Sequence, residues 1–149
     1  MKYKIPVSVL VLVHTPDLKV LLLERADRPG FWQSVTGSQD EGESLAETAA
    51  REVREETGLD SGRYGLIDWQ KQNRFEIYRT WRSRYAPGVT HNLEHVFALC
   101  VPRELPVTLE PREHLRYEWL PWELAAQKAF SWTNVEAIRE LPQRIAEKP

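Results

Sequence analysis

Two short apolar runs open the chain and predict two strands. Residues 7–13 (VSVLVLV) and 19–25 (KVLLLER) flank the turn residues Pro16 and Asp17, which predicts that the strands form a hairpin. Because both runs are almost continuously apolar, we expect the strands to be covered on both faces. Further strands are predicted at 64–70, 74–81, 94–101 and 116–120.

A helical pattern of apolar positions follows Ser44. Glu47 stands three residues after Ser44, which is the spacing of a capping box, and an apolar stripe at helical spacing comes after it. Gly58 is a natural helix terminator because glycine adopts the left-handed conformation at little cost. The pattern therefore predicts a helix between these two residues.

The second half of the chain adds two more predicted helices. One begins at Pro121 and runs through Lys128, and Thr133 with Glu136 predicts the cap of a final helix. Residues 28–43 and 82–92 lack a regular pattern and are expected to be loops. Strands interspersed with helices predict an α/β fold in which a mixed sheet lies between helices.

Composition limits the class of protein. The 149 residues, 42% of them hydrophobic, suit one domain with its own core, and the net charge of −2 argues against a nucleic-acid-binding protein. One cysteine excludes an internal disulfide framework and agrees with a reducing compartment. The apolar run at 7–13 is shorter than the roughly 20 residues that cross a bilayer. We expect one cytoplasmic domain, residues 1–149, with no membrane and no nucleic-acid partner.

Acidic residues gather in residues 37–59. Seven acidic and two basic residues give this segment a net charge of −5, so the rest of the chain carries +3. On a helix, Glu52, Glu55 and Glu56 share one face, where their charges repel. Such a face is either solvated and eased by neighbouring arginines or a site for a hard divalent cation such as Mg²⁺, which prefers oxygen ligands.

The spacing within this segment favours the cation. Residues 37–59 resemble the Nudix box, G-x5-E-x7-R-E-U-x-E-E-x-G-U with U a bulky aliphatic residue, and match every fixed position. The resemblance implies a Nudix fold, an α/β/α sandwich with a mixed central sheet. It also implies hydrolysis of a diphosphate linked to another moiety, with Mg²⁺ or Mn²⁺. The matching residues are Gly37, Glu43, Arg51, Glu52, Val53, Glu55, Glu56, Gly58 and Leu59.

The resemblance also implies roles for the glutamates. Glu52 and Glu56 are expected to bind the metal, and Glu55 to support or share that role. The catalytic base is not fixed by the motif, so Glu52, Glu55 and a carboxylate from outside the box all stay open. Glu113, in a polar loop before the strand at 116–120, is our outside candidate for both catalysis and metal binding, and by composition Glu110 is an equal rival.

Three other box residues are expected to be structural. Gly37 belongs to the loop before the helix, and Arg51 is expected to hold Glu43 and fix that loop against the helix. The four histidines show no metal-ligand spacing, and only His114 adjoins a candidate site residue.

Basic residues outside the box are candidates for phosphate binding. Residues 63–91 carry six Lys or Arg against two acidic residues, which suits either a triphosphate or a solvated edge strand. Arg25, at the end of the second predicted strand, is a better candidate because a guanidinium binds phosphate through two parallel hydrogen bonds.

Segments outside the box narrow the substrate. FWQSVTGS (31–38), FEIY (75–78), RYAPGVTHNLEHVF (84–97) and SWTN (131–134) resemble a bacterial Nudix subgroup that acts on dihydroneopterin triphosphate in folate biosynthesis. A pterin is a flat, hydrogen-bonding heterocycle that suits aromatic faces and a few polar groups. The substrate-binding residues that the resemblance and this chemistry suggest are Lys4, Arg25, Thr36, Phe75, Glu76, Ile77, Tyr78 and Ser131.

Two alternatives stay open. The chain could be a pyrophosphohydrolase of dATP or another nucleoside triphosphate, for nucleotide-pool sanitation. It could also be a non-catalytic Nudix module that senses a nucleotide, although such a module is expected to break the glutamate set, which is whole here. Both a monomer and a homodimer are compatible with the sequence.

Overall fold

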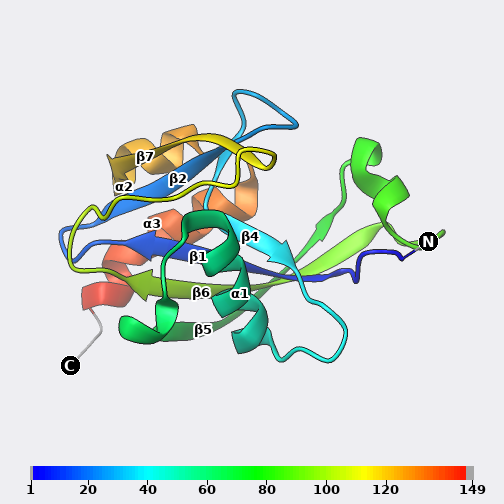
Figure 1. Ribbon diagram of the computed structural model, residues 1–149, viewed down its shortest axis with the longest axis horizontal. Coiled ribbons are helices and arrows are strands. Elements are labelled where there is room, and N and C mark those ends of the chain that lie inside the picture. Colours follow the sequence, from blue (N-terminus) through cyan, green and yellow to red (C-terminus); the bar gives the residue numbers. More distant parts are fainter. Residues whose placement is uncertain (1, 147–149) are drawn as a thin grey trace.

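A seven-stranded sheet organises the computed structural model, which describes residues 2–146 (Figure 1). The strands run in the order β3-β2-β1-β6-β5, with β4 pairing with β1 and β7 with β2. Strands β1 and β6 are parallel and the other pairs are antiparallel, so the predicted mixed sheet is confirmed. The elements are β1 (Val7–His14), β2 (Lys19–Arg25), β3 (Trp32–Gln33), β4 (Val35–Ser38), α1 (Leu45–Thr57), η1 (Ser61–Arg63), β5 (Leu66–Glu76), η2 (Arg79–Arg84), β6 (His91–Cys100), β7 (His114–Pro121), α2 (Trp122–Lys128) and α3 (Trp132–Ala146).

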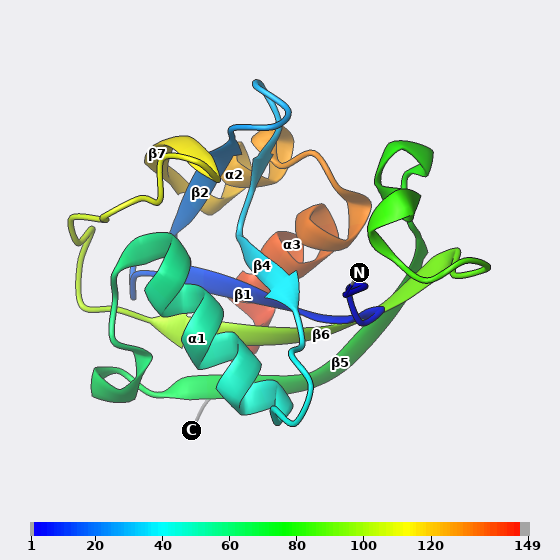
Figure 2. The ribbon, with the colours of Figure 1, turned by 45° about the vertical axis from the view of Figure 1, so that its right-hand side comes forward.

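Helices cover both faces of the sheet. Figure 2 shows α1 in front of it and α2 and α3 behind it. On β1, Val9, Val11 and Val13 pack toward α1, whereas Leu10 and Leu12 pack toward α2 and α3. This alternation explains why the run is continuously apolar: successive side chains point to opposite faces, and both faces are buried. The predicted α/β/α sandwich is therefore confirmed.

The predicted hairpin of β1 and β2 is antiparallel, but the two strands pair only next to the turn. They pair at His14 and Val20, and beyond this point they diverge. The segment 32–38 enters the gap, where β3 pairs with β2 and β4 pairs with β1. The prediction that residues 28–43 are a loop was therefore wrong for β3 and β4. Cross-strand hydrogen bonds to β1 and β2 hold these short strands, and such non-local pairing leaves no periodic signal in a short segment.

The predicted ends of α1 are confirmed. The Ser44 hydroxyl accepts a hydrogen bond from the Glu47 backbone N–H at 3.1 Å, and the Glu47 carboxylate accepts one from the Ser44 N–H at 2.8 Å. Gly58 ends the helix with a φ of 75°. These caps fix the start and the rotation of the helix that carries the box glutamates.

The cap of α3 differs from the prediction. Ser131, not Thr133, holds the cap position: its hydroxyl accepts from Asn134 N–H at 3.3 Å and its carbonyl from Val135 N–H at 3.0 Å. Thr133 lies in the first turn and is buried. Helix α2 runs through Lys128 as predicted but begins at Trp122, one residue later than predicted, because Pro121 ends β7 and is the N-cap. Within residues 2–146, no helix is long and apolar enough to cross a membrane.

The strands predicted at 64–70 and 74–81 are one strand, β5, which ends at Glu76. The polar residues between the two predicted strands do not interrupt β5, because a bulge with Gln70 at a φ of 56° keeps the pairing with β6. In addition, Lys71 forms ion pairs with Glu136 and Glu140 of α3. The chain then leaves the sheet and forms η2 (Arg79–Arg84), which stands apart from the helical layers near the N-terminus in Figure 1. The predicted 82–92 loop is correspondingly shorter, since β6 begins at His91.

Candidate active site

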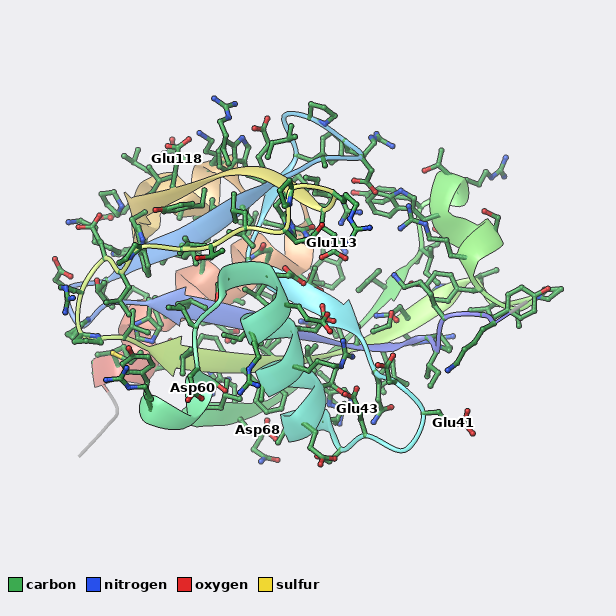
Figure 3. All side chains as sticks on the ribbon, viewed as in Figure 1. Glu41, Glu43, Asp60, Asp68, Glu113 and Glu118 are labelled. Atoms are coloured by element: carbon green, nitrogen blue, oxygen red, sulfur yellow. The ribbon has the colours of Figure 1, made fainter. Side chains whose placement is uncertain are left out.

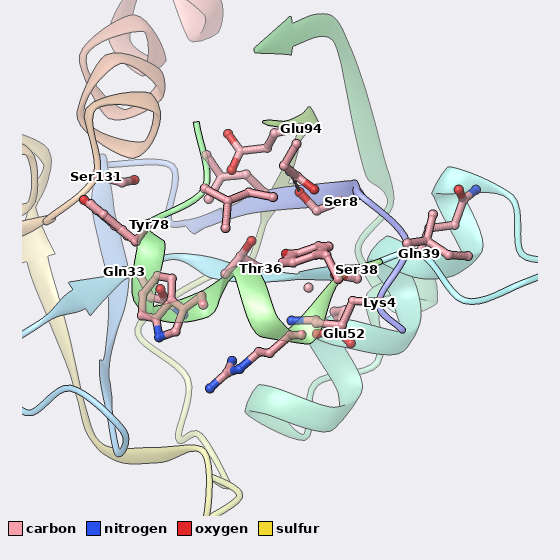
Figure 4. Close-up of a pocket in the computed structure, with 18 of the residues that line it drawn as sticks. Lys4, Ser8, Gln33, Thr36, Ser38, Gln39, Glu52, Tyr78, Glu94 and Ser131 are labelled. Atoms are coloured by element: carbon pink, nitrogen blue, oxygen red, sulfur yellow. Dashed lines mark hydrogen bonds between the residues drawn. The ribbon is translucent and has the colours of Figure 1, made fainter. Parts of the chain in front are cut away.

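A cavity of about 780 Å³ opens beside β4, within the range typical of ligand pockets. Its walls come from the middle and the end of α1, the end of β5 with η2, the loop before β7 and the start of α3. Figure 4 shows Glu52 and Lys4 on one side, Glu94 and Ser8 on the opposite side, and Thr36 between them. The cavity therefore joins the Nudix box to the segments that suggested a heterocyclic substrate.

Glu52 and Glu56 form the acidic end of the cavity. Both are buried, so the alternative of a solvated helix face is wrong for them, because the segment of β4 that fills the β1–β2 gap lies against them. Gly37 of β4 makes this approach feasible: a β-carbon at position 37 would lie 1.9 Å from Glu52 Oε2. The neighbouring Thr36 N–H hydrogen-bonds the Glu56 carboxyl, and the Thr36 hydroxyl donates to the Val9 carbonyl at 2.8 Å.

Burial makes this acidic end costly unless a cation or a proton neutralises it. Burial raises the pKa of Glu52 and raises that of Glu56 strongly, and the two carboxyls are hydrogen-bonded to each other. The charge of Glu113 raises the pKa of Glu56 further. Glu56 Oε1 is buried without a hydrogen-bond partner among the described residues. Two buried carboxylates, one of which has an oxygen without a hydrogen-bond partner, provide the oxygen ligands that a hard divalent cation prefers.

Within residues 2–146, no group of three or more His, Cys, Asp or Glu side chains is already arranged to hold a metal ion. The Glu52–Glu56 pair is thus the core of the candidate metal site.

Arg51 ties the loop before α1 to the acidic end. Its Nε and Nη2 donate to the Glu43 carboxylate at 2.6 and 3.0 Å, and Nη2 also donates to the Ser38 carbonyl at 3.0 Å. The remaining nitrogen, Nη1, donates to Glu52 at 2.6 Å and to Glu55 at 3.2 Å. The predicted contact between Arg51 and Glu43 is therefore present. The guanidinium lowers the pKa of Glu43 to about 2.

The other predicted carboxylates divide into two groups. Glu55 lies on the exposed side of α1, where it pairs with Arg51 and does not line the cavity. Glu113 lines the cavity from the loop before β7 (Figure 3), and its charge acts on Glu56. Its rival Glu110 does not line the cavity, although it pairs at 2.8 Å with Arg112, which does. Of the two loop glutamates, the structure therefore places only Glu113 beside the box.

Basic groups line the cavity near the glutamates. Arg25 pairs with Asp27 at 2.7 Å, and its Nη1 donates to Gln33 at 3.1 Å. Lys4 also lines the cavity, and burial, then the charges of Arg84 and Arg25, lower its pKa. Of the six basic residues in 63–91, only Arg84 lines the cavity. Of the remaining five, Arg74 is exposed on the edge strand β5 and fits the solvated-edge interpretation. Lys71 of β5 pairs instead with Glu136 and Glu140, and the others lie in η1 and η2.

The segment Phe75–Tyr78 lines the cavity with all four residues. A continuing strand would point these side chains alternately to its two faces, but β5 ends at Glu76. Glu76 pairs with Arg82 of η2 at 2.6 Å, Ile77 is buried, and Tyr78 is half exposed. Tyr78 and Trp81 of η2 form an edge-to-face pair at 5.2 Å, so this wall is aromatic. Ser131 lines the same part of the cavity from the cap of α3.

Three cavity residues lie in segments that carry the subgroup resemblance but were not predicted as site residues. Asn92 and Glu94 lie on β6, and Gln33 lies on β3. The first two share a face with the apolar Val96 and Ala98, so two polar positions in an otherwise buried alternation were the available signal. His114 Nε2 lies 3.9 Å from Glu56 Oε1, and burial lowers the pKa of His114 to about 4.

The fold and the acidic end of the cavity together define a Nudix domain, and residues 4–141 match the NUDIX domain family. The chain therefore belongs to this family and is a Nudix hydrolase, as the box indicated. Its relatives include the dihydroneopterin triphosphate diphosphatase of Escherichia coli, 48% identical over 141 residues and 93% of each chain. The enzyme of the same name from Haemophilus influenzae is 41% identical over 94% of this chain and 89% of its own.

Solved structures agree with these relatives. The E. coli dihydroneopterin triphosphate pyrophosphohydrolase superposes with a TM-score of 0.88 at 46% identity, covering 94% of this chain and 97% of its own. A NUDIX hydrolase from Listeria monocytogenes superposes with a TM-score of 0.79 at 26% identity over 95% of each chain. The similarity thus extends over nearly the whole chain, well beyond the box.

Proposed function

We propose that this protein hydrolyses dihydroneopterin triphosphate to dihydroneopterin monophosphate and pyrophosphate, a step of folate biosynthesis. The observation that carries the proposal is that one continuous cavity contains both parts of the site. It joins the buried glutamates of the box to an aromatic and polar wall, so one elongated substrate can reach both. The two relatives of the same name, similar over most of their length, support this substrate.

Glu52, Glu56 and Glu113 would hold the metal, which we propose is Mg²⁺, with Mn²⁺ as a substitute. The unpartnered Glu56 Oε1 and the burial of the two neighbouring carboxyls support this assignment, since a cation would offset the cost of both. Such an ion supplies charge neutralisation to the polyphosphate. Glu55, on the exposed side of α1, supports the site through Arg51.

The chain's own residues would position the substrate and move the proton. Arg25 and Lys4 bind phosphate oxygens, and the hydrogen bonds of Arg25 to Asp27 and Gln33 hold its guanidinium in place. Glu113 accepts the proton of the attacking water, because it lines the cavity from outside the box and its charge acts on Glu56. Thr36 and Ser131, with Phe75–Tyr78, orient the rest of the substrate. We place the reaction in the cytoplasm, by a monomer or a homodimer.

Product identity tests the proposal. The purified protein with Mg²⁺ is incubated with dihydroneopterin triphosphate, dATP and other nucleoside triphosphates, and pyrophosphate and orthophosphate are quantified separately. We expect pyrophosphate and the highest kcat/KM with the pterin. A clear preference for dATP would instead indicate nucleotide-pool sanitation, and binding without turnover would indicate a sensing module. Stepwise release of orthophosphate would contradict the reaction type.

A further inference from the structure

A polar patch interrupts an apolar face of the sheet at the end of the cavity opposite the metal site. On β1 this face carries Leu10 and Leu12, and on β6 it carries Val96 and Ala98, all packed against α2 and α3. Two residues before Val96 on β6, Glu94 points to the same face of the sheet. It is paired in register with Ser8 of β1 and Asn73 of β5. Burying a carboxyl there lowers stability unless hydrogen bonds or an opposite charge compensate for the lost water.

The patch contains acceptors that the protein leaves unused. Glu94 is 4% exposed and lines the cavity, yet its Oε1 has no hydrogen-bond partner in residues 2–146. Asn92, 2% exposed, donates from Nδ2 to the Ser8 hydroxyl at 2.7 Å, and its Oδ1 is likewise unpartnered in that part of the chain. Buried acceptors without donors are rare in folded proteins. Two of them beside one cavity indicate that a ligand brings the donors.

We infer that Glu94, with Asn92 beside it, determines specificity by accepting hydrogen bonds from two adjacent N–H groups on the edge of the substrate's heterocycle. A carboxylate offers two acceptor oxygens and no donor. The 2-amino-4-oxo pyrimidine ring of a pterin, or of guanine, presents a ring N–H beside an exocyclic amine. Adenine presents an amine beside an acceptor nitrogen and leaves one carboxylate oxygen without a donor.

The surroundings of Glu94 agree with this role. Ser8 from β1, Asn73 from β5 and Thr133 from α3 face it, and none of them carries a charge. Burial raises the pKa of Glu94 to about 7, and hydrogen bonding by Thr133 and Asn73 partly offsets the rise. A ligand with two donors would stabilise the ionised form and restore an ordinary acidity.

The inference rests on the proposed function, because a heterocyclic triphosphate must occupy this cavity. The test measures kcat/KM for dihydroneopterin triphosphate and for dATP with the wild type and Glu94→Gln. Glutamine offers one acceptor and one donor, the pattern that complements adenine. We expect the ratio of pterin to dATP to fall about 10- to 100-fold, mainly through the pterin value. Glu94→Asp, which keeps both acceptors, should retain more of the preference.

Glu118→Gln is the matched control, since Glu118 lies on β7, outside the cavity lining, and pairs with Lys128 (Figure 3). We expect it to change neither value. An equal loss for both substrates in Glu94→Gln would show that Glu94 is merely structural and would overturn the inference. Absence of pterin turnover in the wild type would instead refute the proposed function.

A second measurement needs no variant. The nucleotides dGTP and dITP differ only in the exocyclic amine that Glu94 is expected to bind. The wild type should prefer dGTP by about 10-fold in kcat/KM or, where turnover is low, in competitive inhibition. This comparison decides the question even if Glu94→Gln fails to fold, because equal values for the two nucleotides would overturn the inference.

Discussion

Gly37 lies so close to Glu52 that a β-carbon at position 37 would sit 1.9 Å from Glu52 Oε2. Because Gly37 has no side chain, α1 can lie close enough to β4 to bring the Glu52 carboxylate to the cavity. In Gly37→Ala, Glu52 must move, and a displacement of about 1 Å in a catalytic site costs roughly 100-fold in rate. We expect a loss of this size in kcat and weaker Mg²⁺ binding, measured by steady-state kinetics and calorimetry.

Gly62→Ala in η1 is the matched control for this substitution. A β-carbon at position 62 would lie 3.2 Å from the Asp60 carboxylate, which is the end of a flexible side chain. We expect it to leave kcat unchanged. Wild-type activity in Gly37→Ala would contradict the role assigned to this close approach.

Glu56→Gln separates metal binding from stability. The variant removes a buried carboxyl whose pKa is strongly raised by burial, so the metal-free protein should melt at the same temperature as the wild type or higher. Turnover should fall at least about 100-fold, because a ligand that neutralises charge contributes several kcal/mol. Added Mg²⁺ should raise the Tm of the wild type but not of the variant. An unchanged Mg²⁺ effect would exclude Glu56 as a ligand.

Glu113 and Glu110 provide a matched pair within one loop. Glu113 lines the cavity and its charge acts on Glu56, whereas Glu110 pairs with Arg112 and does not itself line the cavity. We expect Glu113→Gln to lower kcat by about 100-fold or more, the usual contribution of a general base. Glu110→Gln should retain wild-type kcat. Equal activities of the two variants in the same assay would remove Glu113 from the mechanism.

The contact between Arg51 and Glu43 predicts an acid-dependent loss of stability. The folded protein holds the pKa of Glu43 at about 2, below its usual value of 4.5. A lowered pKa stabilises the fold above the unfolded value, and this contribution disappears as the pH falls from about 4.5 toward 2. Glu43→Gln should therefore be less stable than the wild type at pH 7, and the difference should shrink in urea titrations at pH 3.5. A constant difference would argue against the ion pair as its cause.

Substrate preference should depend on pH through Glu94. Its pKa of about 7 means that the free enzyme holds this carboxyl partly protonated near neutrality. Above that pH it offers two acceptors, and below it one oxygen becomes a donor that suits adenine. The kcat/KM ratio of pterin to dATP should thus rise between pH 6 and pH 8. In Glu94→Gln the ratio should be flat over the same range.

Local chemistry in the sequence predicted a large part of this protein. The caps at Ser44 and Gly58 defined α1, because capping depends on residues only a few positions apart. The unbroken apolar pattern of β1 correctly indicated burial on both faces. The spacing of the box glutamates indicated the family, and the comparisons confirm it.

What local patterns missed depended on partners distant along the chain. Strands β3 and β4 exist because β1 and β2 diverge and leave backbone groups to pair. The two segments predicted around residues 71–73 form one strand because β6 and α3 satisfy its polar residues. Neither outcome follows from a short window, since the hydrogen bonds and the burial that decide it come from other elements.

The sequence by itself determined which helix carries the acidic residues, where that helix starts and ends, and which family it belongs to. Only the tertiary structure decided that Glu52 and Glu56 are buried while Glu55 is exposed, that Glu113 rather than Glu110 reaches the cavity, and that Glu94 faces it. The physical reason is the distance along the sequence over which each interaction acts. Helix caps and residue spacing act within a few residues, whereas burial and electrostatic coupling arise where β4, α1 and the loop before β7 meet.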